Sequence, residues 1–180
     1  SLFMAITRSL FRTLSQHVLS PAKIVTEMNN SISDNNESNM FVTLIVGILD
    51  LETGILKLCN AGHNPPILIY PDGQVSYLEF KTQIFVGVVE DFKYSDEEVV
   101  LEKESKLFLY TDGVTEAENI NKELYGEEKL LEMLSDNASS DVRTTVNVVV
   151  DSIASHVKEA EASDDLTILL IQYEPGTANS

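Results

Sequence analysis

The segment Leu107-Phe-Leu-Tyr-Thr-Asp-Gly-Val-Thr-Glu116 constrains the fold more than any other, because four apolar residues run directly into an acidic-glycine turn. An apolar run of this length, bounded by turn residues, predicts a buried strand. The strand would bring Asp112 to the end of a sheet, and Gly113 would free the backbone to turn. Asp112 is therefore a candidate metal-binding carboxylate, although an ordinary strand-ending Asp-Gly turn has the same local pattern.

A second acidic pair precedes another apolar run, in Ser163-Asp-Asp-Leu-Thr-Ile-Leu-Leu-Ile171. If the two predicted strands are neighbours in one sheet, Asp112 and either Asp164 or Asp165 converge at the same edge. Hard oxygen ligands that lie close together suit Mg²⁺ or Mn²⁺. A helix-to-strand loop with solvated acids is the alternative interpretation of this pair.

Composition and charge exclude several classes of partner. The 180 residues are 43% hydrophobic, which is enough for one domain with a sizeable core. Twelve basic against 29 acidic residues give 12 − 29 = −17, a balance that argues against binding nucleic acid or an anionic membrane surface. No apolar stretch reaches the roughly 18 residues that span a membrane, so we expect a soluble, cytoplasmic chain with no membrane insertion by this segment.

Hydrophobic periodicity and turn residues predict an α+β layered domain of mostly antiparallel strands. Strands 99–101 and 106–110 are expected to pair across the short loop between them, and 50–54 is expected to be a hairpin turn. The predicted helices cover 2–18, 21–32, 127–135 and 141–158, and the predicted strands cover 40–49, 55–60, 67–70, 75–80, 99–101, 106–110 and 166–173.

Three further features are assigned structural roles. The lone Cys59 is expected to be a plain core or half-buried thiol. His63 could serve as a general acid or ligand, but we interpret it as a loop-locking residue that hydrogen-bonds the backbone. The remaining feature is an acidic run, interpreted as a solvated edge rather than a metal site, that comprises Glu90, Asp91, Asp96, Glu97 and Glu98.

Taken in order, these motifs resemble the SpoIIE-like and RsbU-like branch of the PPM metal-dependent serine/threonine phosphatases. The resemblance covers nearly all of the chain and implies an α-β-β-α layered sandwich. It implies that Asp112 and Asp164 are metal ligands, with Asp165 beside them where related enzymes often carry Asn. The motifs that carry it are Phe41-Val-Thr-Leu, Gly47-Ile-Leu-Asp-Leu-Glu-Thr-Gly54, Asn60-Ala-Gly-His-Asn-Pro-Pro66, Leu109-Tyr-Thr-Asp-Gly-Val-Thr-Glu116, Tyr125-Gly-Glu-Glu-Lys-Leu130 and Asp164-Asp-Leu-Thr167.

The sequence departs from the family pattern at two places. The segment Thr82-Gln-Ile-Phe-Val-Gly87 stands where family members usually have G-x-P-L-G, and the family's metal-binding G-D-x-x-G-K/H-G motif would lie before Ser1. We therefore expect residues 1–174 to be an N-terminally truncated phosphatase domain, followed by a flexible tail over 175–180. As given, the chain is expected to hydrolyse phosphate esters poorly or not at all.

The resemblance implies hydrolysis of a protein phosphoserine or phosphothreonine by a water that two Mn²⁺ or Mg²⁺ ions activate. The implied substrate is a phosphorylated regulatory protein of the anti-sigma-factor-antagonist type, and an upstream sensor or receiver domain is the implied input. The alternative is a non-catalytic pseudophosphatase that acts as a binding or dimerisation module. A homodimer is possible through the apolar stripe of the first helix, which comprises Leu2, Phe3, Ile6, Leu10, Phe11 and Leu14.

Overall fold

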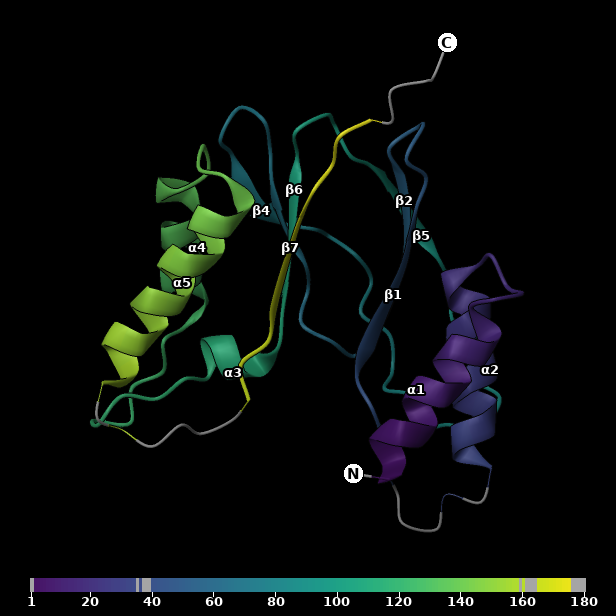
Figure 1. The fold of residues 1–180 in the computed structure, drawn as a ribbon. Coiled ribbons are helices and arrows are strands. Elements are labelled where there is room, and N and C mark those ends of the chain that lie inside the picture. The colour runs from purple at the N-terminus through teal and green to yellow at the C-terminus, as the bar shows by residue number, and fades with distance from the viewer. Residues whose placement is uncertain (1, 35, 37–39, 159, 161–164, 176–180) are drawn as a thin grey trace. The chain divides into compact units, whose positions relative to one another are not determined.

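The computed structural model describes residues 2–34, 36, 40–158, 160 and 165–175, and within them the chain forms five helices and seven strands. The chain divides into two compact units, each assembled from two separate stretches of sequence (Figure 1). Unit 1 comprises Ser1–His63 and Phe80–Val100, and unit 2 comprises Asn64–Glu79 and Leu101–Ser180.

Unit 1 is a three-stranded antiparallel sheet with two helices. Strand order is β1-β2-β5, formed by β1 (Leu44–Leu49), β2 (Ile55–Ala61) and β5 (Glu97–Val100). The β1–β2 turn is stabilised by the carboxylate of Asp50, which accepts hydrogen bonds from the backbone N–H groups of Glu52 and Thr53. These hydrogen bonds, that of Thr53 first, hold the pKa of Asp50 below its usual value. The hairpin predicted over 50–54 is confirmed.

Helix α2 (Pro21–Ser33) packs on this sheet and contributes half of the buried residues of its core, and helix α1 (Leu2–Leu14) packs beside α2. Ser20 caps α2 by accepting a hydrogen bond from the Lys23 N–H, and the proline at the first helical position fits the helix start. Asp96 also caps this end, because its carboxylate accepts hydrogen bonds from the Ser20 hydroxyl at 2.7 Å and from the Ala22 N–H. The prediction that Asp96 belongs to a merely solvated edge is therefore wrong.

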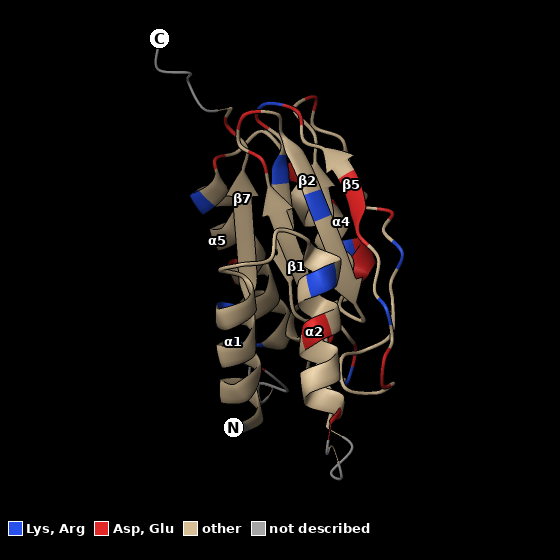
Figure 2. Cartoon of the chain, turned by 90° about the vertical axis from the view of Figure 1, so that its right-hand side faces the viewer, with Lys and Arg blue, Asp and Glu red and all other residues tan. Residues whose placement is uncertain are grey.

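The acidic residues of β5, Glu97 and Glu98, lie at a sheet edge. Glu98 forms an exposed ion pair with Lys57 of β2 at 2.9 Å. In Figure 2, β5 carries a red stretch and the neighbouring strand β2 a blue one. Exposed pairs of this kind contribute little to stability because water and salt screen the two charges. Here the charges mainly keep the edge strand polar on its solvent side.

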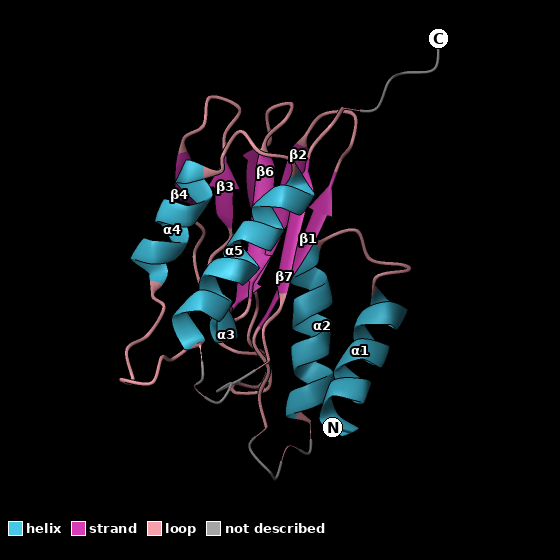
Figure 3. Cartoon of the chain, turned by 60° about the vertical axis from the view of Figure 1, so that its left-hand side comes forward, coloured by secondary structure: helices cyan, strands magenta, loops and turns pink. Residues whose placement is uncertain are grey.

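Unit 2 is a four-stranded antiparallel sheet in the order β4-β3-β6-β7. Its strands are β3 (Ile67–Ile69), β4 (Val75–Tyr77), β6 (Lys106–Tyr110) and β7 (Ile168–Gln172). Helices α4 (Glu127–Asp136) and α5 (Val142–Val157) lie side by side over one face of this sheet (Figure 3). The core between them includes Phe108 of β6, Leu130 and Leu134 of α4, and Val149 of α5.

Strand pairing corrects one prediction about the sheet. The segment 99–101 does not pair with 106–110, because β5 pairs with β2, whereas β6 lies between β3 and β7. β6 is buried along most of its length and needs an apolar strand on each side, and both neighbours supply one. β5, with alternating exposure, is suited to an edge.

Other boundaries differ by a few residues. Helix α1 ends at Leu14 rather than at 18, and β1 begins at Leu44 rather than at 40. The predicted turn at Asp112 is the start of a short helix, α3 (Asp112–Thr115). In the apolar stripe of α1, Phe3, Leu10 and Leu14 pack on the core of unit 1, while Ile6 and Phe11 are exposed. The tail beyond residue 175 lies outside the described residues.

Candidate metal centre at the ends of strands β6 and β7

The predicted convergence of two strand ends is found in unit 2. The β6–β7 ladder reaches the pair Tyr110 and Ile168, and the segments just beyond it remain bonded to each other. The Thr111 N–H donates to the Thr167 carbonyl at 3.1 Å, and the Thr167 N–H donates to the Thr111 hydroxyl at 3.1 Å. The same hydroxyl donates to the Asp165 carbonyl at 3.4 Å. Asp112 and Asp165 therefore stand on adjacent segments. Figure 1 shows β6 running into α3 at this end of the sheet.

Gly113 permits this close approach by lacking a side chain. A Cβ atom at Gly113 would lie 2.5 Å from the carbonyl oxygen of Asp165 and 3.1 Å from its carbonyl carbon. Backbone atoms cannot move aside as a flexible side-chain tip can, so any larger residue would push the two segments apart. The glycine of the Thr-Asp-Gly motif is required here for space.

Asp112 is exposed and occupies the first position of α3. One of its carboxylate oxygens accepts a hydrogen bond from the Gly113 N–H at 3.0 Å, and its carbonyl accepts one from the Glu116 N–H at 2.8 Å. The backbone around this carboxylate is thus fixed by short-range hydrogen bonds. Such fixed geometry is what a metal-binding carboxylate requires.

The structure describes two of the three predicted metal ligands. Asp112 and the exposed Asp165 are brought together, whereas Asp164 lies outside the described residues. Among the residues that the structure describes, no group of three or more His, Cys, Asp and Glu side chains is arranged to hold a metal ion. A full coordination sphere thus needs oxygen ligands in addition to these two carboxylates.

The loop that follows β2 is locked by a residue that sequence reasoning did not assign. The side chain of the buried Asn60 donates to the His63 carbonyl at 2.9 Å and accepts from the His63 N–H at 2.8 Å. The loop-locking amide is therefore that of Asn60, acting on the main chain of His63. The available sequence signal was an Asn placed three residues before His63, at the start of a Gly-containing loop, since Asn side chains often close local turns.

Two buried side chains of unit 1, those of Cys59 and Gln83, have structural roles. Cys59 is fully buried, which confirms the interpretation as a core thiol, and burial raises its pKa to about 12. In the segment that departs from the family pattern, Gln83 is buried and its amide bridges to Ser95, accepting from the Ser95 N–H at 2.8 Å and donating to the Ser95 carbonyl at 3.0 Å. This segment has a structural role within unit 1.

Comparison with known proteins places the chain in a family. The family model described as Stage II sporulation protein E, SpoIIE, matches residues 1–174. The chain belongs to the SpoIIE family. This membership confirms the predicted PPM branch and makes the chain part of a phosphatase-domain family.

Curated relatives of this SpoIIE-family chain are longer than it is. Protein IcfG of Synechocystis sp. is 24% identical over 198 residues, which cover 95% of this chain and 31% of IcfG. Phosphoserine phosphatase RsbU of Bacillus subtilis is 22% identical over 173 residues, which cover 96% of this chain and 51% of RsbU. The chain thus spans about a third to a half of these relatives.

Solved structures show that the SpoIIE-family chain has the fold of a PP2C-type phosphatase domain. The SiaA-PP2C domain of Pseudomonas aeruginosa has a TM-score of 0.84 at 20% identity, covering 96% of this chain and 70% of that one. The RsbU and RsbW domains of Rv1364c from Mycobacterium tuberculosis give a TM-score of 0.76 at 21% identity, with 95% and 47% covered. The predicted α+β class of PPM type is confirmed. No helix among the described residues has the length and apolar character that a membrane span requires.

Proposed function

We propose that the chain is the C-terminal part, residues 1–174, of a protein serine/threonine phosphatase domain, followed by a tail over 175–180. Family membership supports this proposal, as do relatives whose names describe phosphoserine phosphatases. The observation that carries it is the bonded contact between the segment of Asp112 and that of Asp165, with Gly113 between them.

The donor set fits a hard divalent cation. Two residues with carboxylate side chains, Asp112 and Asp165, stand on adjacent backbone segments. These segments can approach each other because Gly113 has no Cβ atom. Related phosphatases offer a parallel, since the catalytic domain of PstP was solved in complex with two manganese ions and RsbX with magnesium. We therefore propose Mn²⁺ or Mg²⁺ as cofactor, two ions per intact domain.

In this proposal Asp112 and Asp164 hold the cations, and Asp165 assists at the neighbouring position. When bound, the cations would supply a water of lowered pKa and neutralise charge on the phosphoryl group. The chain's own contribution is geometric: Thr111 joins the two segments, and the α3 turn aims the Asp112 carboxylate. The further ligands would come from the family motif upstream of Ser1.

The proposed substrate is a phosphorylated regulatory protein of the anti-sigma-factor-antagonist type, and the input an upstream sensor or receiver domain. RsbU and RsbP of Bacillus subtilis, both named phosphoserine phosphatases, support this proposal. Cytoplasmic location is part of the same proposal.

The test is a phosphatase assay, with Mn²⁺ and a phosphoserine peptide, of the protein that includes the upstream motif. Asp112→Asn should abolish metal-dependent turnover because Asn keeps the shape but loses the charge that holds a divalent ion. Asp164→Asn should do likewise, and Asp165→Asn should be milder. Asp136→Asn, an exposed acid at the end of α4, is the matched control.

An inactive parent protein, or full activity in Asp112→Asn with unchanged metal affinity, would contradict the proposal. The first result would make the chain a pseudophosphatase that binds or dimerises. The chain of 180 residues by itself should show little turnover.

A further inference from the structure

Two phenylalanine rings of unit 1 are stacked on each other at the protein surface. Phe41 and Phe85, here called the aromatic pair, have ring centroids 5.4 Å apart and an interplanar angle of 27°. Phe41 is 56% exposed and Phe85 is 41% exposed. Clustered exposed aromatics are uncommon on monomers and are typical of binding surfaces. Other exposed apolar residues flank the pair along the chain, namely Met40, Val88 and Val89.

The backbone under the aromatic pair is held by hydrogen bonds between its two segments. Val42 and Val86 exchange two backbone hydrogen bonds of 3.0 Å each. The side chain of Asn36 donates to the carbonyls of Met40 at 2.6 Å and Gly87 at 3.1 Å, and it accepts from the Met40 N–H at 2.9 Å. The segments on either side of the rings are therefore tied together at several points.

The segment that carries Phe85 is also held by the buried amide of Asn29 and packs against Gly62. Asn29, fully buried on α2, accepts from the Gly87 N–H at 2.9 Å and donates to the Val89 carbonyl at 2.8 Å. The ring of Phe85 lies over Gly62, where any Cβ would overlap it. The exposed rings are thus preorganised, and a partner that binds them would not bear the cost of ordering this surface.

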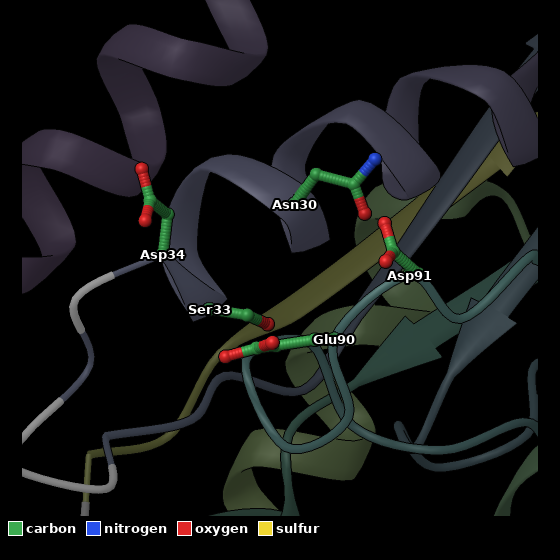
Figure 4. A pocket seen from close by; sticks show the side chains of 5 residues that line it. All are labelled: Asn30, Ser33, Asp34, Glu90 and Asp91. Carbon is green, nitrogen blue, oxygen red and sulfur yellow. The ribbon is translucent and has the colours of Figure 1, made fainter.

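Glu90 and Asp91, which come shortly after Phe85 in the sequence, help to line an acidic pocket. It has a volume of about 210 Å³ and is lined by Asn30, Ser33, Asp34, Glu90 and Asp91. Figure 4 shows the Glu90 carboxylate beside Ser33 and the Asp91 carboxylate beside the Asn30 amide. No basic side chain is among these lining residues. Glu90 follows Phe85 by five positions, and such a stretch spans at most roughly 17 Å of extended chain.

We propose that the aromatic pair and the acidic pocket form a docking surface for a polypeptide segment of a partner protein. The segment would place an aromatic or large aliphatic side chain on Phe41 and Phe85, and a Lys or Arg within about five residues would enter the acidic pocket. Charge complementarity favours a basic partner over a second copy of this chain, since each copy carries −17. This inference goes beyond the proposed phosphatase activity and uses none of its metal-binding residues.

The test is selection of a phage-displayed peptide library on the immobilised protein, followed by measurement of Kd for enriched peptides by fluorescence polarisation. The expected consensus is an apolar anchor with a nearby Lys or Arg. Phe41→Ala and Phe85→Ala should each weaken binding by about tenfold or more. Phe11→Ala is the matched control, because Phe11 of α1 is 40% exposed and lies outside the surface.

The acidic pocket is tested separately. Glu90→Gln combined with Asp91→Asn should weaken binding and reduce its salt dependence, and Asn is suitable at position 91 because it tolerates the left-handed backbone found there, φ 55°. Circular dichroism and urea unfolding establish that each variant is folded.

Three results would overturn the proposal: no enriched peptide, enriched peptides without the apolar and basic pattern, or binding that survives both phenylalanine changes. A dimer in light scattering that is lost in Phe85→Ala would assign the surface to a second copy of the chain instead. Since peptide binding needs no catalysis, the proposed phosphatase activity and the docking surface can fail independently.

Discussion

Replacing Gly113 by Ala tests whether the close approach of two backbone segments positions the candidate metal centre. The new Cβ would lie 2.5 Å from the Asp165 oxygen, whereas ordinary contact begins at 3.4 Å, so the segments must separate by 3.4 − 2.5 = 0.9 Å. The backbone itself would accept Ala, because Gly113 is not among the positive-φ residues. Overpacking of this kind costs about 1–3 kcal/mol, and the helix preference of Ala over Gly returns about 0.5–1 kcal/mol.

We therefore expect Gly113→Ala to lower the free energy of unfolding by about 0.5–2 kcal/mol, measured by urea titration. Metal binding should suffer more, because 0.9 Å exceeds the roughly 0.2 Å tolerance of ligand distances. In the protein with its upstream motif, calorimetric titration with Mn²⁺ should show an affinity lower by about 10–100-fold, as for other changes that displace ligands.

Gly47→Ala is the matched control for Gly113→Ala. Gly47, in unit 1, is also a glycine without positive φ, and the one tight contact of its added Cβ would be the flexible tip of the Leu58 side chain at 2.8 Å. This control is expected to leave Mn²⁺ affinity unchanged. Wild-type Mn²⁺ affinity in Gly113→Ala would refute the reasoning, since the approach of residues 113 and 165 would then have no part in positioning ligands.

Three further predictions concern stability and reactivity. Lys106→Met should lower the free energy of unfolding by about 1.5–3 kcal/mol in urea titration, because the buried ammonium donates to the carbonyls of Ala138 and Ser140; an unchanged midpoint would contradict this. Burial raises the pKa of Cys59 from 9.0 to about 12, so this thiol should resist iodoacetamide at pH 9 until urea unfolds the protein, and rapid labelling of the folded protein would contradict this. The contribution of the buried thiol to the free energy of unfolding should be present below pH 9 and be lost as the pH rises toward 12. Asp96→Asn should lower the free energy of unfolding by about 0.5–2 kcal/mol, because it weakens the cap of α2, and thermal unfolding should show a lower melting temperature. A melting temperature equal to that of the wild type would show that the cap is dispensable.

Local sequence signals predicted most elements, but not every neighbour in the sheets. The hairpin at Asp50 was predictable because its turn residues fix the register locally. The pairing of β5 with β2 was not predictable from local sequence, because the short loop between β5 and β6 suggests a hairpin of those two strands. The observed pairing depends on which strand can be buried on both faces, and that strand is β6 rather than β5. Burial of this kind is a property of the assembled sheet and is not visible in a short segment.

The same distinction applies to the candidate metal centre. Asp112 and Asp165 could be predicted as neighbours, because each flanks a buried strand and the two strands pair. The role of Thr111, which bonds to both Asp165 and Thr167, could not, since a hydroxyl has no periodic pattern and its partners are more than 50 residues away. Asp164, outside the described residues, stays a prediction.

The interleaving of the two units has a consequence for the order in which the chain folds as it leaves the ribosome. All strands and helices of unit 1 have been synthesised once residue 100 has emerged, but the hairpin of β3 and β4 then still lacks β6. Every residue of β3 is buried in the finished sheet, so its open edge is apolar until Lys106–Tyr110 arrives. Nascent chains stalled shortly after residue 100 should therefore be the most prone to aggregation, and those stalled after β7 the least.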